Sequence, residues 1–339
     1  WVDGSGNWSD DDNHWATSSG GSGGGGNLPT SSDDVFFDAN SGFGSGGTIT
    51  LNTAPWIKSI TQTSGHTYSF ATYSNFYVED SATFESGCSS PDKLNLYLTG
   101  VSQDSTLTQG GTSILDINIV DTGKWTLQGD LVITGEFYHD NGTFDANDHN
   151  ITAATFYFYA DTGNAPTVYM GSGTWNQTEG AGTIYFEQYS GEYITVYPET
   201  STIKIFGENG GISSLYVYDD EDVEQGKTFN NIWFYGEAGS GFYIRNSQTF
   251  NDFKCDVEGA EIEFRRGYTT TVSTFTVSGA SGNLITLKSS SSGTQFTLSK
   301  SSGTVECDYL DIIDSNAIGG AHWYAGDNST DSGNNSGWI

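Results

Sequence analysis

Paired carboxylates are the first residues of this sequence whose types and spacing could do chemistry. Glu261 and Glu263 alternate with apolar residues, so in a β-strand both side chains would project from one face, about 7 Å apart. A glycosidase uses two carboxylates roughly 5 to 9.5 Å apart. Arg265 and Arg266 follow directly and would suit a polysaccharide lyase that acts on a uronate. The simpler interpretation is the solvent face of a strand, and we expect no catalytic residue here.

Oxygen-rich loops are the second possible source of chemistry. Five carboxylates fall within the six residues of segment 219–224. Ca²⁺ takes six to eight oxygen ligands in proteins. The candidate ligands are Asp219, Asp220, Asp222 and Glu224. A second oxygen-dense loop spans 327–334. Neither loop follows the 12-residue calcium-loop pattern, and the alternative is a solvated acidic turn. We therefore expect that the protein requires no cofactor. Ca²⁺ is the cofactor that these loops could hold.

The sequence carries no motif for nucleophilic or metal-dependent catalysis. The five histidines show no metal-ligand spacing, and no Gly-x-Ser-x-Gly elbow or phosphate-binding loop occurs. We therefore predict a protein that is not an enzyme, with a polysaccharide depolymerase as the alternative.

The three cysteines form an odd set, which allows at most one internal disulfide. Cys255 and Cys307 are 52 positions apart, close to the length of two coils, and are the candidate pair. The other interpretation is that both are buried thiols, because free cysteine packs as a small apolar side chain.

Aromatic side chains offer a possible glycan-binding surface. Several crowd one region, namely Tyr216, Tyr218, Trp233, Tyr235 and Tyr243. Alternation along a strand would send some of them into the core and leave the others exposed. A patch that binds surface glycans is one hypothesis, and core packing is the other.

Composition and charge restrict the partners. The 339 residues carry 11 Lys and Arg against 42 Asp and Glu, for a net charge of −31. A nucleic-acid binder needs basic residues that neutralise phosphates, so nucleic acid is not an expected partner. Membrane insertion is not expected either, since no apolar run approaches the roughly 20 residues that span a bilayer.

The elements that must position these residues are short β-strands. Runs rich in Ile, Val, Tyr, Phe and Thr recur between Gly, Asn, Asp and Ser, as at 48–51, 183–186, 202–206 and 284–287. Apolar residues do not recur with helical spacing, and strong helix formers are sparse. The pattern predicts an all-β fold.

Internal repetition decides how the strands are connected. Lys227-Thr228-Phe229-Asn230-Asn231 is echoed by Gln248-Thr249-Phe250-Asn251-Asp252, and Phe275 and Phe296 follow at similar spacing. A recurrence of 20 to 25 residues is typical of one coil of a parallel β-solenoid, in which like side chains stack. We predict a right-handed parallel β-helix with a ladder of phenylalanines. A β-sandwich is the alternative.

The predicted boundaries give three segments. Residues 1–33 form an N-terminal cap, 34–315 the parallel β-helix and 316–339 a C-terminal cap or inter-subunit segment. Both ends are rich in aromatic residues, and solenoid ends need caps against edge-to-edge growth. Apolar end coils can pair with the next subunit, and Trp1, Trp338 and Ile339 are the residues that we expect to mediate this end-to-end assembly.

Several short segments also carry a family resemblance: 6–9 with His14-Trp15, 33–40, 142–147, 322–326 and 334–339. They resemble the repeat modules of right-handed parallel β-helical phage fibre or surface proteins and bacterial extracellular adhesins. The resemblance implies a structural or adhesive protein, usually one part of a longer chain. We expect an extracellular, cell-surface or virion-surface protein that acts as a rigid fibre or filament subunit and contacts copies of itself or neighbouring domains. The alternative is a carbohydrate-active β-helix or glycan-binding module.

Overall fold

The computed structural model describes residues 1–44, 46–63, 65, 67–72, 74–86, 94–100, 104–110, 114–189, 191–219 and 226–339. The chain divides into two compact units. Unit 1 consists of Trp1–Ala154 and Asn164–Tyr169, and unit 2 consists of Thr155–Gly163 and Met170–Ile339. The described residues include no helix that is long and apolar enough to cross a membrane.

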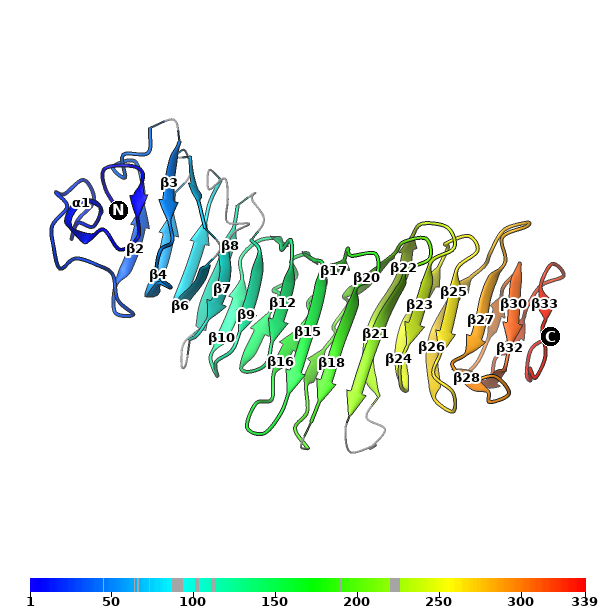
Figure 1. Ribbon diagram of the computed structural model, residues 1–339. Helices are drawn as coiled ribbons and strands as arrows, with labels where there is room; N and C mark the ends of the chain where they lie inside the picture. Colours follow the sequence, from blue (N-terminus) through cyan, green and yellow to red (C-terminus); the bar gives the residue numbers. More distant parts are fainter. Residues whose placement is uncertain are drawn as a thin grey trace. The chain divides into compact units, whose positions relative to one another are not determined.

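Unit 1 consists of strands, with one short helix, α1, after the first of them in its described residues (Figure 1). Its elements are β1 (Gly6–Asn7), α1 (Asp11–His14), β2 (Asp34–Phe37), β3 (Gly47–Thr50), β4 (Trp56–Gln62), β5 (Tyr68–Phe70), β6 (Ser74–Phe84), β7 (Leu94–Leu98), β8 (Asp104–Gln109), β9 (Asp116–Ile119), β10 (Lys124–Leu127), β11 (Leu131–Val132), β12 (Glu136–His139), β13 (Thr143–Asp145), β14 (Ile151–Ala153) and β16 (Thr167–Tyr169). The strands pair in parallel from coil to coil, as β10 does with β8 on one side and β13 on the other.

Unit 2 repeats this architecture with longer strands. Its elements are β15 (Thr155–Ala160), β17 (Thr174–Gln177), β18 (Thr183–Gln188), β19 (Thr195–Tyr197), β20 (Thr202–Gly207), β21 (Ile212–Asp219), β22 (Lys227–Gly236), β23 (Gly241–Ile244), β24 (Gln248–Cys255), β25 (Glu261–Phe264), β26 (Thr269–Val277), β27 (Ile285–Ser289), β28 (Phe296–Lys300), β29 (Thr304–Glu306), β30 (Leu310–Ile313), β31 (Ser315–Gly319), β32 (His322–Tyr324) and β33 (Thr330–Asp331).

Two parallel sheets run along unit 2. One joins β15, β18, β21, β23, β25, β27, β30 and β33, and the other joins β17, β20, β22, β24, β26, β28 and β31. A short third pairing links β29 to β32. Every one of these ladders is parallel, so the predicted all-β parallel β-solenoid is confirmed.

The phenylalanine ladder exists, but its members differ from those predicted. Phe229 and Phe250 pair across β22 and β24, with ring centroids 5.9 Å apart. Phe275 instead stacks on Phe253, and Phe296 stacks on Phe264 at 4.5 Å. The predicted column was therefore wrong beyond Phe250. Strand register decides which residues lie side by side. Because the coils differ in length, phenylalanines with similar spacing in the sequence need not occupy paired positions on successive strands.

Buried glutamines satisfy backbone groups beside the strand ladders. The Gln109 side chain accepts from Val132 N at 2.6 Å and donates to Val132 O at 3.0 Å. In unit 2, Gln177 Oε1 accepts from the backbone N of Phe206, and Gln248 Oε1 from that of Lys227. A buried amide N–H or carbonyl needs a partner, and these side chains supply it.

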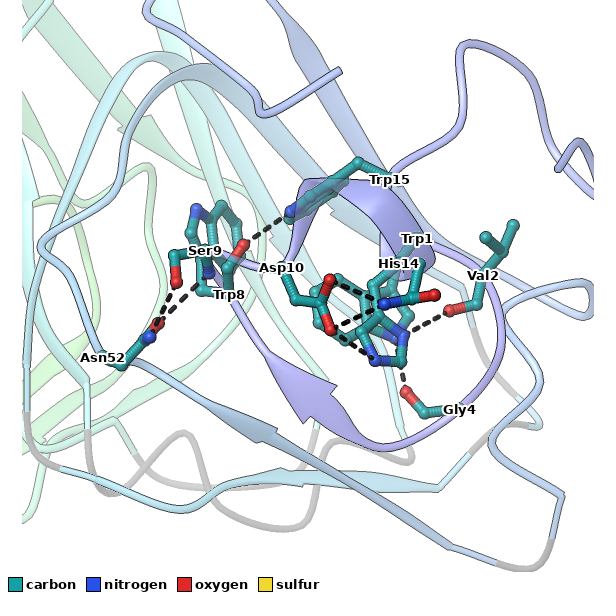
Figure 2. Close-up of polar contacts among 10 residues, drawn as sticks. Trp1, Val2, Gly4, Trp8, Ser9, Asp10, His14, Trp15 and Asn52 are labelled. Atoms are coloured by element: carbon teal, nitrogen blue, oxygen red, sulfur yellow. Dashed lines mark hydrogen bonds and ion pairs between the residues drawn. The ribbon is translucent and has the colours of Figure 1, made fainter. Parts of the chain in front are cut away.

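An aromatic cluster caps the first coils of unit 1 (Figure 2). Trp1, Trp8 and Trp15 are only 1 to 6% exposed. The Trp1 indole N–H donates to Gly4 O, and that of Trp15 to Trp8 O at 2.7 Å. The Trp1 ring stacks on His14 at 4.7 Å. Trp1 is therefore a core residue of the cap, and its ring is not exposed for the end-to-end assembly that the sequence predicted.

Residues 316–339 continue the coil of unit 2. β31 pairs with β28, and β33 pairs with β30. Trp338 is half-buried; its ring lies 5.3 Å from that of Trp323, and its indole N–H donates to Ser315 Oγ at 3.0 Å. Ile339 is 65% exposed. Of the residues predicted to mediate assembly, Ile339 is the one that offers an exposed apolar side chain.

Candidate functional site

Strands β15, β18 and β21 place polar aromatic side chains on the outside of unit 2. In β15, buried Phe156 and Phe158 alternate with half-buried Tyr157 and Tyr159. Successive side chains of a strand point to opposite faces, so the phenylalanines that fill the core force the tyrosines outward. The same alternation recurs in β18 and β21.

Parallel register lines these outward side chains up in two columns. One consists of Tyr157, Tyr185 and Tyr216, and the other of Tyr159, Glu187 and Tyr218. Tyr189 follows β18, and its ring lies 5.4 Å from Tyr159 and 5.3 Å from Tyr218. We call this set, Tyr157, Tyr159, Tyr185, Glu187, Tyr189, Tyr216 and Tyr218, the tyrosine face.

The rings of the tyrosine face are in mutual contact. In the first column, the ring centroids of Tyr157 and Tyr185 lie 5.1 Å apart, and those of Tyr185 and Tyr216 lie 5.7 Å apart. The rings of Tyr216 and Tyr218 are nearly parallel, with an interplanar angle of 8° and ring centroids 6.1 Å apart. Neighbouring strands are about 4.8 Å apart, so each coil adds roughly one ring per column. The surface is ordered because each ring is held by its neighbours.

Glu187 is the acidic centre of the tyrosine face. Its Oε2 accepts from the Tyr157 hydroxyl at 2.5 Å and from the Tyr189 hydroxyl at 3.2 Å. Burial, and then the Glu187 carboxylate, raise the pKa of Tyr189 to about 12. Tyr189 therefore keeps its proton at physiological pH and remains a hydrogen-bond donor.

An arginine borders the tyrosine face. The Arg245 guanidinium lies 5.8 Å from the Tyr216 ring centroid and 4.8 Å from that of Tyr243, within the range of cation–π attraction. Burial raises the pKa of Tyr216, Glu187 raises it further, and Arg245 acts in the opposite direction. The cation is thus engaged with ring faces at one edge of the surface.

The aromatic patch predicted from the sequence divides between two sheets. Tyr216, Tyr218 and Tyr243 lie on the sheet that contains β21 and β23, whereas Trp233 and Tyr235 lie on β22 in the other sheet. The five side chains therefore do not form one patch, and none of them is buried in the core as the alternative hypothesis expected. Residues close in sequence separate here because consecutive strands of a coil belong to different sheets.

Trp233 and Tyr235 form a second cluster with two lysines. Lys204 Nζ lies 4.3 Å from the Trp233 ring centroid and 4.2 Å from that of Tyr235, and Lys254 Nζ lies 4.0 Å from Trp233. Asp256 accepts from the Trp233 indole at 3.1 Å and pairs with Lys254 at 2.9 Å. The polar groups of this cluster satisfy one another, which fits a packed surface.

Sequence reasoning missed most of the tyrosine face. Tyr157, Tyr159, Tyr185, Glu187 and Tyr189 were not selected. The alternation of Phe and Tyr over 155–159 is the signal that could have identified an outward aromatic strand. It does not show which strand lies beside it, because that depends on the register.

Glu261 and Glu263 project outward from β25, as the alternation predicted. Lys288 on the neighbouring strand β27 pairs with both, at 2.7 Å to Glu261 and 3.5 Å to Glu263. Burial by itself lowers the pKa of Lys288, but the hydrogen bonds and charges of Glu261 and Glu263 together outweigh it, so the pKa is raised. Arg265 lies over the Tyr268 ring at 5.1 Å and thus points to a different partner.

The predicted calcium ligands fall largely outside the described residues. Asp220, Asp222 and Glu224 lie there, and Asp219 is described only as the last residue of β21. In the second loop, the Asn328 backbone N and side-chain amide donate to the two oxygens of Asp308, and these bonds lower the pKa of Asp308. Within the described ranges, no group of three or more His, Cys, Asp or Glu side chains could hold a metal ion.

Cys255 and Cys307 are separate, buried thiols, so the disulfide alternative is corrected. Cys255 pairs with Val277 on the next coil, and the Cys307 thiol meets the backbone of Val277 from the coil beyond. Cys255 and Cys307 are thus separated by two strand spacings, roughly 10 Å, which exceeds the Cα–Cα distance that a disulfide allows. Burial raises the pKa of both thiols to about 12.

Unit 1 offers two further surface features. Trp56, Tyr77 and Tyr97 stack on adjacent strands at 5.3 and 4.8 Å, with the Trp56 indole donating to Glu79. A groove of about 680 Å³ opens beside the cap, lined by loop residues 15–19 and 26–30 together with the start of β2. Asp33, Asp34 and Asp38 are the acidic residues of its lining.

Comparison of the chain with protein-family models gave no match, and comparisons with curated proteins and with solved structures gave none either.

Proposed function

We propose that this protein is a structural β-solenoid with an adhesive surface: a rigid, non-enzymatic extracellular or virion-surface element that holds polysaccharide on its tyrosine face. The observation that carries the proposal is the contiguous outer surface of six tyrosines around Glu187 on β15, β18 and β21. The repeat-module resemblance of the sequence supports the same role.

Chemistry favours a sugar as the ligand of this surface. Tyrosine presents an apolar ring and a polar hydroxyl on one rigid side chain, which suits a ligand with both C–H and O–H groups. The columns repeat with each coil, so they offer equivalent positions to the repeating units of a linear polysaccharide. A surface built from parallel ladders also reorganises little on binding, which lowers the entropic cost.

The supporting scaffold suits a load-bearing role. Parallel ladders connect successive coils throughout unit 2, and the core between the sheets is filled by stacked rings such as Phe158 on Phe186 at 4.6 Å and 8°. Close packing of this kind transmits strain with little deformation. An adhesive surface on such a scaffold can withstand pulling by its ligand.

Affinity electrophoresis through gels that contain different polysaccharides tests the proposal. We expect retardation in at least one gel, and at least about 10-fold weaker binding for the double variant Tyr185→Ala and Tyr218→Ala, since truncating a central aromatic contact costs more than about 1 kcal/mol. Tyr324→Ala, at a 40% exposed tyrosine of β32, is the matched control and should bind normally.

Two results would contradict the proposal. One is migration unaffected by every neutral, acidic and amino polysaccharide tested. The other is retardation that the double variant retains in full, which would place the adhesive surface elsewhere. Release of soluble sugar from any of the gels would instead favour the depolymerase alternative.

A further inference from the structure

We infer that Glu187 makes the tyrosine face selective for polysaccharides that carry protonated primary amines, that is, polymers of amino sugars. This inference rests on the proposed function and names its ligand class. It is carried by the position of one carboxylate among six tyrosine rings on an outer sheet surface.

The hydrogen bonds of Glu187 fix its carboxylate in one orientation. Both bonds that described residues make to it end on Oε2, from the hydroxyls of Tyr157 and Tyr189. Neither hydroxyl carries a positive charge, so the negative charge of Glu187 is solvated by dipoles and is not neutralised. Oε1 is the oxygen at which a ligand ammonium group can donate.

No cation of the described residues forms an ion pair with Glu187. Glu261 and Glu263 on the same sheet show the contrast, because Lys288 pairs with both. Arg245, at the edge of the face, is directed at the rings of Tyr216 and Tyr243. Glu187 is thus an acid of this sheet whose counter-ion a ligand can supply.

The rings around Glu187 favour the same ligand. The faces of aromatic rings carry negative potential and attract ammonium groups, and a carboxylate within the same surface strengthens this attraction. The net charge of the chain, −31, repels polyanions such as polyuronates and favours a cationic chain. Ring stacking gives general sugar affinity, and Glu187 adds the preference for an amine.

Isothermal titration of the full chain with glucosamine oligomers and with N-acetylglucosamine oligomers of equal length tests the inference. The titrations are made at about pH 5.5, between the ordinary pKa of a glutamate and that of an amine. We expect the free-amine oligomer to bind about 10-fold more tightly, and added salt to reduce this difference. Glu187→Gln keeps the shape of the side chain and should reduce the preference to near unity.

Glu306→Gln, at an exposed glutamate on β29, is the matched control and should keep the preference. Equal binding of both oligomers by the unmodified chain, or a preference that Glu187→Gln retains, would overturn the inference while leaving the adhesive function intact. No binding of either oligomer, together with no retardation by any polysaccharide, would mean that the proposed function itself has failed. Circular dichroism and melting of both variants show whether each is folded.

Discussion

In the N-terminal cap, Trp8 and Trp15 are 1 and 3% exposed and lie 4.7 Å apart, edge to face. On the tyrosine face, Tyr185 and Tyr216 also contact each other, at 5.7 Å, but both rings are half-buried on the outside of a sheet. Both regions are networks of aromatic side chains. They differ in what their polar atoms contact.

In the cap, the indole N–H groups of Trp1 and Trp15 donate to the backbone carbonyls of Gly4 and Trp8. The hydroxyls of Tyr157 and Tyr189 converge instead on a side-chain carboxylate at the surface. Groups satisfied by their own backbone fix a fold, whereas a charge held by neutral donors can still attract a ligand. Aromatic content alone therefore does not distinguish a core from a binding surface.

The largest effect that we predict is in the cap. Trp8→Ala should lower the free energy of unfolding of unit 1 by about 3 to 5 kcal/mol, because it leaves a cavity among Trp15, Phe76 and Phe37. Trp56→Ala is the matched control in the same unit, since Trp56 is 52% exposed, and should cost about 1 kcal/mol or less. Denaturant titration followed by far-UV circular dichroism measures the loss of unfolding free energy in both variants. Equal losses would contradict the distinction between buried cap rings and surface rings.

The next effect concerns a buried ring that titrates. Burial lowers the pKa of His139 in β12 from 6.5 to about 4, while hydrogen bonding to the backbone of Asn141 and Gly142 opposes the shift. The unfolded chain binds the proton more readily, so stability is present above pH 6.5 and is lost as the pH falls toward about 4. The loss amounts to about 3 kcal/mol.

His139→Phe should flatten this pH dependence, as measured by denaturant titration of both proteins between about pH 4 and 7. The control is His149→Gln, whose imidazole is partly exposed and lies 3.7 Å from Asp130. It should keep the slope of the unmodified chain. A slope that survives in His139→Phe would show that other groups carry the acid sensitivity.

The smallest stability effect is expected on the tyrosine face. Tyr185→Ala removes two ring contacts, with Tyr157 and Tyr216, at a half-buried position. Aromatic pairs contribute about 0.5 to 1.5 kcal/mol each, and part of the ring is already hydrated, so thermal or chemical unfolding should shift by only about 1 kcal/mol. A loss as large as that of Trp8→Ala would show that the tyrosine face is a structural core and would weaken its assignment as a binding surface.

Much of the fold was predictable from local patterns. The 20 to 25 residue recurrence, the short strands and the sparse helix formers predicted the parallel solenoid, and alternation around Glu261 and Glu263 correctly placed both side chains outside. These features depend on period and composition, which a sequence displays directly.

The candidate site was less predictable. Tyr216 and Trp233 were grouped because they are near in sequence, yet they lie on different sheets. Trp1 was expected at an exposed end, yet it is buried within the cap. In both cases the answer depended on contacts between segments that are distant along the chain.

The sequence by itself determined which side chains face inward and which face outward along each strand, because that choice depends only on a period of two. The tertiary structure decided which outward residues become neighbours. Tyr159, Glu187 and Tyr218 are about 30 residues apart in turn, and only the register of three parallel strands places the carboxylate between the rings. That register is set by turns of unequal length and by core packing, which act on the whole coil at once.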